Sequence, residues 1–294
     1  MTMPPPPPQA QTPPQAYQAP QQPQQGWGGP TGPYASPIPV RTPGLGDAIA
    51  SEWTKIRSVR STMWTLGVMI VLLIGIGLLV ALIVSMSDAP LDDAPVLTLG
   101  FFGVLLGSIC VITLGVLTIA SEYSTGMIRT TLTACPSRAR MLTAKSIVFF
   151  LLAFTITTVT TGIVGVLQTA ILDGATPDTG LWVRSTLGIG LYIATLGLLS
   201  LAVGAIIRHS AGAITIMIAV VLLPLVLAIF MFSPTLASVQ EALFEYSIPN
   251  QIGAMYDASV TTSGPTGWEP LWVMLGVTAV AMAGAFASLD RRDV

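Results

Sequence analysis

The sequence predicts an all-α polytopic membrane protein, and three observations lead to this prediction. The 294-residue chain is 52% apolar and only 9% charged, whereas soluble domains carry about 25% charged residues. Its mean hydropathy is +0.74. Six uncharged runs are each long enough to cross a bilayer as a helix, for which about 20 residues suffice. A β-barrel would instead need shorter segments of alternating polarity.

The first segment, residues 1–44, differs in composition from everything that follows. It holds 14 of the 23 prolines and eight glutamines. Such a segment cannot bury a core, and we expect a disordered or polyproline-II-like cytoplasmic tail. Two roles stay open for it: a ligand for a proline-recognising domain, or a solubilising tail.

Residues 45–62 have the pattern of an amphipathic helix. Apolar side chains recur at spacings of three and four, from Leu45 through Ile49, Trp53 and Ile56, with charged residues between them. A helix of this kind, with a tryptophan and basic residues, is suited to the membrane interface. We expect it to run directly into the first span.

The remaining chain, residues 63–294, is expected to form one six-span domain. None of the six runs contains Asp, Glu, Lys, Arg or His, which argues against ion-driven transport because ion-coupled transporters usually carry ionisable groups at mid-membrane. The spans are expected at about 64–85, 96–120, 146–172, 187–207, 211–232 and 271–289.

The basic residues indicate the orientation. With a cytoplasmic N-terminus, only Arg184 of the 12 lysines and arginines lies outside. This is the positive-inside pattern, and it predicts a multi-pass protein of the cytoplasmic (inner) membrane with both termini cytoplasmic. The eleven inner ones are Arg41, Lys55, Arg57, Arg60, Arg129, Arg138, Arg140, Lys145, Arg208, Arg291 and Arg292.

The connection between spans two and three, residues 121–146, gathers charge that the rest of the chain avoids. Glu122 is expected near the negative C-terminal end of a helix, which costs a carboxylate about 0.3–1 kcal/mol, so another group should hold it there. Gly126 is expected to end that helix. Pro136 is expected to begin the next one.

Between that glycine and proline, the segment MIRTTLTA predicts a short helix with Ile128 and Leu132 on one face. The residues themselves leave two roles open for the connection. Its charges can anchor two helices to the inner lipid headgroups, or they can dock a soluble partner.

The connection resembles the cytoplasmic loop of type-2 ABC transporter permeases, the membrane subunits of many bacterial exporters. The resemblance rests on Glu122, Gly126, the short segment after it, the triplet Pro136-Ser137-Arg138 and Lys145. It extends over about residues 46–294, through the interfacial helix, six spans, an outer re-entrant segment and a basic C-terminus.

The resemblance implies that the short segment is the coupling helix, which sits in a groove of a separate ATP-binding subunit. It also implies a second permease copy or paralogue, so that two chains enclose one pathway. The residues that would dock or couple are Glu122, Gly126, Ile128, Arg129, Leu132, Pro136, Ser137, Arg138 and Lys145.

The sequence carries no motif for nucleotide hydrolysis of its own. A phosphate-binding loop reads GxxxxGK[ST], but Thr54 and Ala144 precede the two lysines, Lys55 and Lys145. We therefore expect no enzyme activity and no bound cofactor, with ATP and Mg²⁺ on the partner subunit. His209 is the only histidine, so no catalytic or metal site is expected. The mild net charge of −2 indicates no bulk attraction to nucleic acid, and membrane lipids are expected partners of the six spans.

Several small or polar residues allow two interpretations. Thr157, Thr161 and Gln168 in span three can line a pathway, or the threonines can bond to their own helix. Pro224 in span five predicts a kink near such a pathway. Small residues at spacings of four or eight can serve packing within the chain or a dimer; they are Gly103, Gly107 and Gly115, and Ala279, Ala283 and Ala287.

The outer segment 233–270 predicts a helix that starts at Ser233-Pro234 and is broken by Pro249 and Asn250. It matches the paired outer half-helices of the resembled family, or else it is an amphipathic helix resting on the outer leaflet. Two other functions remain as alternatives for the whole chain: a non-transporting membrane scaffold that recruits a cytoplasmic partner, and an ion-driven secondary transporter.

Overall fold

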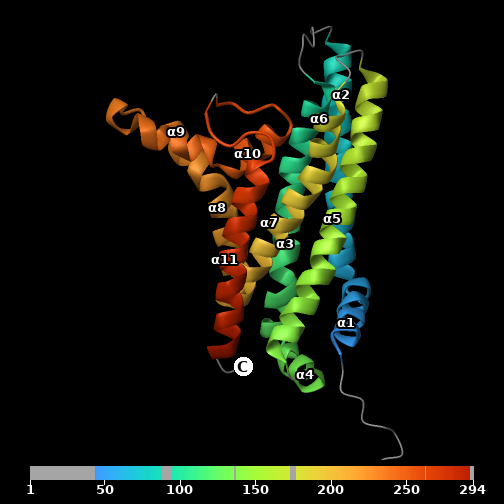
Figure 1. Ribbon diagram of the computed structural model, residues 1–294. Coiled ribbons are helices and arrows are strands. Elements are labelled where there is room, and N and C mark those ends of the chain that lie inside the picture. Colours follow the sequence, from blue (N-terminus) through green and yellow to red (C-terminus); the bar gives the residue numbers. More distant parts are fainter. Residues whose placement is uncertain (1–43, 88–94, 136, 173–176, 262, 292–294) are drawn as a thin grey trace, which may run out of the picture. The chain divides into compact units, whose positions relative to one another are not determined.

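The computed structural model describes residues 44–87, 95–135, 137–172, 177–261 and 263–291, and every regular element in these ranges is helical (Figure 1). Six helical stretches in this part of the chain are long and apolar enough to cross a membrane. The prediction of an all-α polytopic membrane protein is thus confirmed. The expectations for the proline-rich tail lie outside the described residues. The spanning helices are α2 (Arg60–Met86), α3 (Phe101–Ser124), α5 (Arg138–Ile171), α7 (Ile189–Ile207), α8 (Ser210–Phe230) and α11 (Glu269–Arg291).

Helices α2, α5 and α11 are longer than the uncharged runs, and α3 extends past the end of its run, because polar end turns remain helical. Glu122 therefore lies in the last turn of α3, and Lys145 lies within α5. Both residues lie, as predicted, outside the uncharged runs, which contain no Asp, Glu, Lys, Arg or His. Three short elements extend the spans: η1 (Val96–Gly100) leads into α3, while α6 (Thr179–Val183) and the π-helical turn η2 (Arg184–Gly188) lead into α7.

Helix α7 lies at the centre of the bundle. In the most apolar stretch of the span that contains it, 78% of the residues are buried, against 22% for α2, α8 and α11. Its glycines permit close helix contacts: a Cβ added to Gly115 of α3 would lie 2.5 Å from the carbonyl oxygen of Gly197. Small residues at such crossings bring backbones together where lipid offers no hydrophobic driving force.

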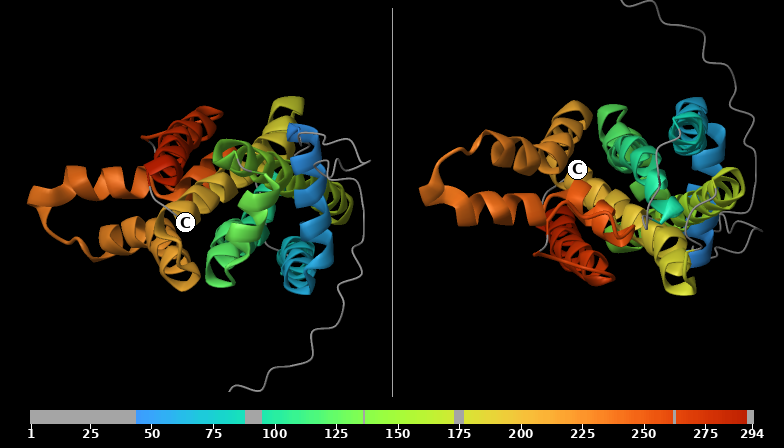
Figure 2. Two further views of the ribbon diagram at one scale, coloured as in Figure 1. Left: turned by 90° about the horizontal axis from the view of Figure 1, so that it is seen from below. Right: turned by 90° about the horizontal axis from the view of Figure 1, so that it is seen from above.

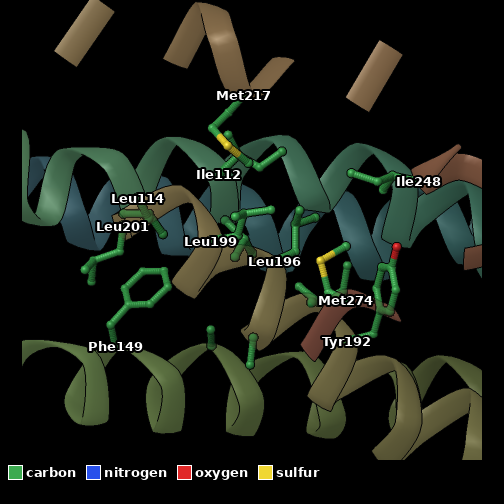
Figure 3. Packing of buried hydrophobic residues seen from close by; sticks show 14 of the residues in the cluster. Ile112, Leu114, Phe149, Tyr192, Leu196, Leu199, Leu201, Met217, Ile248 and Met274 are labelled. Carbon is green, nitrogen blue, oxygen red and sulfur yellow. The ribbon is translucent and has the colours of Figure 1, made fainter. Parts of the chain in front are cut away.

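The two seams of small residues have different surroundings. Gly103, Gly107 and Gly115 all contact neighbouring helices of the same chain, which confirms packing within the chain for the α3 seam. Ala279, Ala283 and Ala287 of α11 are exposed. Apolar side chains of α7 such as Leu196 share one core with side chains of the surrounding helices, including Phe149 of α5 and Met274 of α11 (Figure 3).

At one end of the bundle, α1 (Leu45–Ser58) lies across the spans, as the view along the helices shows (Figure 2). Val59 has an extended backbone (φ −85°, ψ 109°) that ends α1 before α2 begins. The expectation that the interfacial helix continues directly into the first span was therefore wrong. The short helix α4 (Met127–Ala134) lies at this same end, which we call the α1–α4 end (Figure 1).

The opposite end carries η3 (Pro234–Leu236), α9 (Ala237–Glu245) and α10 (Ile248–Met255). The chain breaks at Ser247, not at Pro249 and Asn250 as predicted. The reason is that the Ser247 hydroxyl caps α10 by accepting a hydrogen bond from the Asn250 N–H. Pro249 fits the first turn because its missing N–H has no partner there. Every residue of α10 is buried, whereas α9 has none buried.

Candidate functional site

Four charged side chains from three helices meet at the α1–α4 end. Glu52 and Lys55 come from α1, Glu122 from α3 and Lys145 from α5; we call them the charge cluster. Lys145 Nζ lies 2.6 Å from Glu52 Oε2 and 2.9 Å from Glu122 Oε1. Lys55 Nζ lies 2.7 Å from Glu52 Oε1 and 3.0 Å from Glu122 Oε1. Each cation thus bridges both carboxylates.

Local structure explains why these residues converge. Glu52 occupies the buried face of α1 together with Ile56, and Lys55 lies less than one turn further on. Glu122 lies in the last turn of α3, where the helix dipole disfavours a carboxylate. The ammonium groups of Lys55 and Lys145 offset that penalty. They are the groups that the sequence analysis expected to stabilise Glu122 at the helix end.

The cluster is largely removed from water. The Lys145 side chain is 2% exposed and both carboxylates 5%, while Lys55 is 27% exposed. Burial pushes the pKa of Glu52 upward, but attraction to Lys145 and Lys55 outweighs it, so the pKa lies below its usual value. Burial likewise pushes the pKa of Lys55 down, yet hydrogen bonding and attraction to Glu52 and Glu122 leave it raised. The two α1 groups are therefore held in their charged forms.

The charge cluster also reaches α4. Lys55 Nζ donates a hydrogen bond of 3.3 Å to the Thr131 hydroxyl, so α1, α3, α4 and α5 are joined through one set of polar contacts. One oxygen remains unused: Glu122 Oε2 is buried and has no hydrogen-bond partner among the described residues.

Gly126 creates the turn between α3 and α4. Its φ of +72° lies in the left-handed region, and its N–H donates to the Tyr123 carbonyl at 3.3 Å. The sequence prediction of a glycine that ends the helix is confirmed. On α4, Ile128 is buried and Leu132 half-buried, as expected for one inward face. The outward side consists of Met127, Arg129, Thr130 and Thr133, all exposed; we call it the α4 face.

The next helix begins at Arg138 and not at Pro136, which lies outside the described residues. Ser137 is the N-cap, since its hydroxyl accepts a hydrogen bond of 3.3 Å from the Arg140 N–H. Arg138 Nη1 donates to the Leu289 carbonyl of α11 at 2.6 Å. This arginine therefore fastens the C-terminal turn of α11 to the start of α5.

Ile128 and Leu132 face inward on α4, and Pro136 lies outside the described residues; the other predicted docking residues divide into three groups by environment. Gly126 and Arg129 are exposed, Glu122 and Lys145 are buried in the charge cluster, and Ser137 and Arg138 organise helix ends. A direct role in binding a partner is open to the first group, while burial suits the second to a supporting role.

Sequence reasoning missed Glu52 and Lys55 as members of the cluster. A signal was present: Glu52 lies three residues after Ile49 and four before Ile56, so it interrupts the apolar face of α1 with a charge. A carboxylate on such a face requires a cation opposite it.

The predicted pathway residues of α5 are buried within the chain. Thr157 and Gln168 are fully buried, and Gln168 Nε2 donates to the Gly77 carbonyl of α2 at 3.0 Å. Thr161 bonds to the carbonyl of Thr157, which confirms bonding to its own helix. Pro224 lies half-buried on another helix, α8. Whether any of these positions lines a pathway stays a prediction.

The sequence also predicts no metal site and no catalytic role for His209. In the part of the chain that the structure describes, no group of three or more histidine, cysteine or acidic side chains could hold a metal ion. His209 caps α8 instead, because its Nδ1 accepts a hydrogen bond of 3.1 Å from the Gly212 N–H.

Comparison with known families identifies the chain. The family described as ABC-2 family transporter protein matches residues 48–230, more than half of the sequence. The match runs from α1 to the end of α8 and so contains the charge cluster and α4. No curated protein matches the chain. Membership implies an ATP-binding partner subunit in general terms. The chain thus belongs to the ABC-2 transporter family and is a multi-pass membrane permease of an ABC transporter.

Proposed function

We propose that this permease is the membrane subunit of an ATP-driven exporter, and that a separate ATP-binding subunit docks on the α4 face. One observation carries the proposal: α4 exposes one side and is attached through the other to a buried polar network. Family membership supplies the expectation of such a partner.

The charge cluster attaches the inward side of α4 to the neighbouring helices. Ile128 is buried beneath the helix, and Thr131 is hydrogen-bonded to Lys55. Lys55 is in turn bonded to carboxylates of α1 and α3, and both carboxylates to Lys145 of α5. Because a buried charge cannot be left without its partner, these groups move together. A movement of α4 therefore also displaces α1, α3 and α5.

In this proposal ATP and Mg²⁺ bind to the partner, and the permease itself is not an enzyme. ATP binding closes the partner subunits, α4 moves with them, and the spans rearrange to open outward. The α1–α4 end faces the cytoplasm of a bacterial cell, as the distribution of basic residues supports. A second permease completes the pathway, for which the exposed alanines of α11 offer a close-packing surface.

Docking is tested by charge reversal on the α4 face. We expect Arg129→Glu to abolish co-purification of a P-loop ATPase from mild detergent. The matched control is Arg57→Glu, an exposed arginine on α1 outside the α4 face, which should keep the ATPase. Equal retention in both variants would show that the α4 face is not the docking site.

Transport itself is tested in vesicles. Export should require both the partner and ATP, and uphill transport by the purified permease alone would contradict the proposal. Deleting residues 1–44 distinguishes a permease from a scaffold. A scaffold that recruits its partner through the proline-rich tail would lose that partner, whereas the permease should still stimulate its ATPase.

A further inference from the structure

A groove of about 450 Å³ lies between α1, α2 and α3 beside the charge cluster. All four members of the charge cluster line it at one side, and apolar side chains such as Val59, Leu114 and Leu117 line it elsewhere. Hydroxyl groups supply much of its remaining wall: Ser58, Ser61, Thr65, Thr118, Ser121 and Thr125.

The hydroxyls of this groove offer acceptors rather than donors. Most of them already donate their proton to a backbone carbonyl one turn back, as Thr118 does to Leu114 at 2.6 Å and Thr125 to Ser121 at 2.7 Å. Ser58, Thr65 and Ser121 do the same. A hydroxyl so engaged retains lone pairs that can accept further hydrogen bonds.

The ammonium groups in the wall are likewise largely engaged, since Lys145 directs two of its donors to Glu52 and Glu122. An ammonium group has three N–H donors, and Lys55 directs its donors to Glu52, Glu122 and Thr131. Glu122 in contrast keeps a buried oxygen, Oε2, without any donor. An unsatisfied buried carboxylate oxygen is costly. The groove therefore favours a ligand that brings N–H donors and positive charge.

The location favours an amphiphile over a soluble ion. The groove lies where α2 begins, and Met63 and Trp64 are exposed on that first turn. Tryptophan at this level is typical of the boundary between headgroups and acyl chains. Val59, Leu114 and Leu117 provide the apolar part of the wall. The volume holds a lipid headgroup, while acyl chains would continue outside along the apolar surface of the spans.

We propose that this groove binds the headgroup of a phospholipid that carries a primary ammonium group. Its N–H donors contact the hydroxyls of α3 and the carboxylate of Glu122, and its acyl chains remain in the surrounding bilayer. The site depends on membrane embedding alone and is independent of nucleotide-driven transport. A lipid bound there would fill the space between α1 and the first two spans.

The test measures lipid binding to the full chain by native mass spectrometry in detergent. Phosphatidylethanolamine, its mono- and dimethyl derivatives and phosphatidylcholine are compared with identical acyl chains. Each methylation removes one N–H donor while charge and phosphate stay the same. We expect affinity to fall along the series, with phosphatidylethanolamine binding about tenfold more tightly than phosphatidylcholine. A tenfold difference in affinity is about what one hydrogen bond to a charged group contributes.

Variants place the effect in the groove. Thr118→Val, Ser121→Ala and Thr125→Val together should remove the preference for phosphatidylethanolamine, and Ser121→Ala alone should reduce it. The control is Thr113→Val, since Thr113 lies on the same helix, bonds to its own helix in the same way and is not part of the groove. This variant should keep the preference unchanged.

Three results would overturn the proposal. Equal affinity along the methylation series would show that N–H donors are not recognised. Stronger binding of phosphatidylglycerol than of phosphatidylethanolamine would show that the site recognises the phosphate and not the ammonium group. Binding of dodecylammonium as tight as that of phosphatidylethanolamine would identify the occupant as a cationic amphiphile rather than a lipid.

Discussion

Replacing Lys145 by methionine tests whether the charge cluster holds α1 to the bundle. The methionine keeps an unbranched side chain of similar length and removes the charge. Lys145 is almost fully buried, and it bonds to Glu52 of α1 at 2.6 Å and to Glu122 of α3 at 2.9 Å. After the substitution, two buried carboxylates share one partly exposed cation, Lys55.

The magnitude follows from the geometry. Two unit charges 2.6 Å apart attract by about 6 kcal/mol at an effective dielectric constant of about 20, before desolvation is subtracted. Removal of one partner from a buried ion pair typically destabilises by about 3–5 kcal/mol, because the other charge stays buried. Since Lys55 still contacts both carboxylates, we expect a loss of about 3 kcal/mol for the attachment of α1.

Amide hydrogen exchange of α1 in the full chain in nanodiscs measures this attachment. A loss of about 3 kcal/mol corresponds to exchange about a hundredfold faster across residues 45–58. Arg57→Met is the matched control, because Arg57 is an exposed cation on the same helix. Its effect on exchange should be small.

A double-mutant cycle decides whether the effect comes from the ion pair. Glu52→Gln together with Lys145→Met leaves Lys55 paired with Glu122, so the double variant should lose at least about 2 kcal/mol less than the two single losses combined. Additive losses, or a Lys145→Met variant that exchanges no faster than Arg57→Met, would refute the reasoning.

Three further predictions concern stability, measured as the thermal midpoint of unfolding in detergent. Gly126→Ala should lower it by the equivalent of about 1–2 kcal/mol, because φ is +72° there, and Gly126→Asn should lower it less. Gly115→Ala should cost about 1–3 kcal/mol, because the new Cβ meets the α7 backbone, whereas Gly75→Ala, with nothing within 4 Å, should be neutral. The pKa of Glu52 is lowered below its ordinary 4.5, so its contribution to stability is complete above that pH and is lost as pH falls through the lowered pKa. Glu52→Gln should remove this part of the acid destabilisation, and an unchanged acid profile would contradict the assignment.

The sequence alone was sufficient for the fold class, the number of spans and the short helix after Gly126. These features depend on local properties: the length of apolar runs, the absence of charge within them, and the conformational freedom of one glycine. The prediction that Glu122 requires a holding group was likewise local, since it rested on the helix dipole.

The identity of that group was decided only by the tertiary structure. Glu52 and Lys145 are 93 residues apart in the chain, and no local pattern pairs them. The break at Ser247 was misplaced for a local reason, because the Ser247 hydroxyl rather than the proline sets the start of α10. The break at Val59 was missed because the apolar periodicity continues through it. Each charge in the cluster is tolerable only beside the others, because burial removes the water that would otherwise solvate it. Such mutual dependence arises between helices, and so only the assembled bundle determines it.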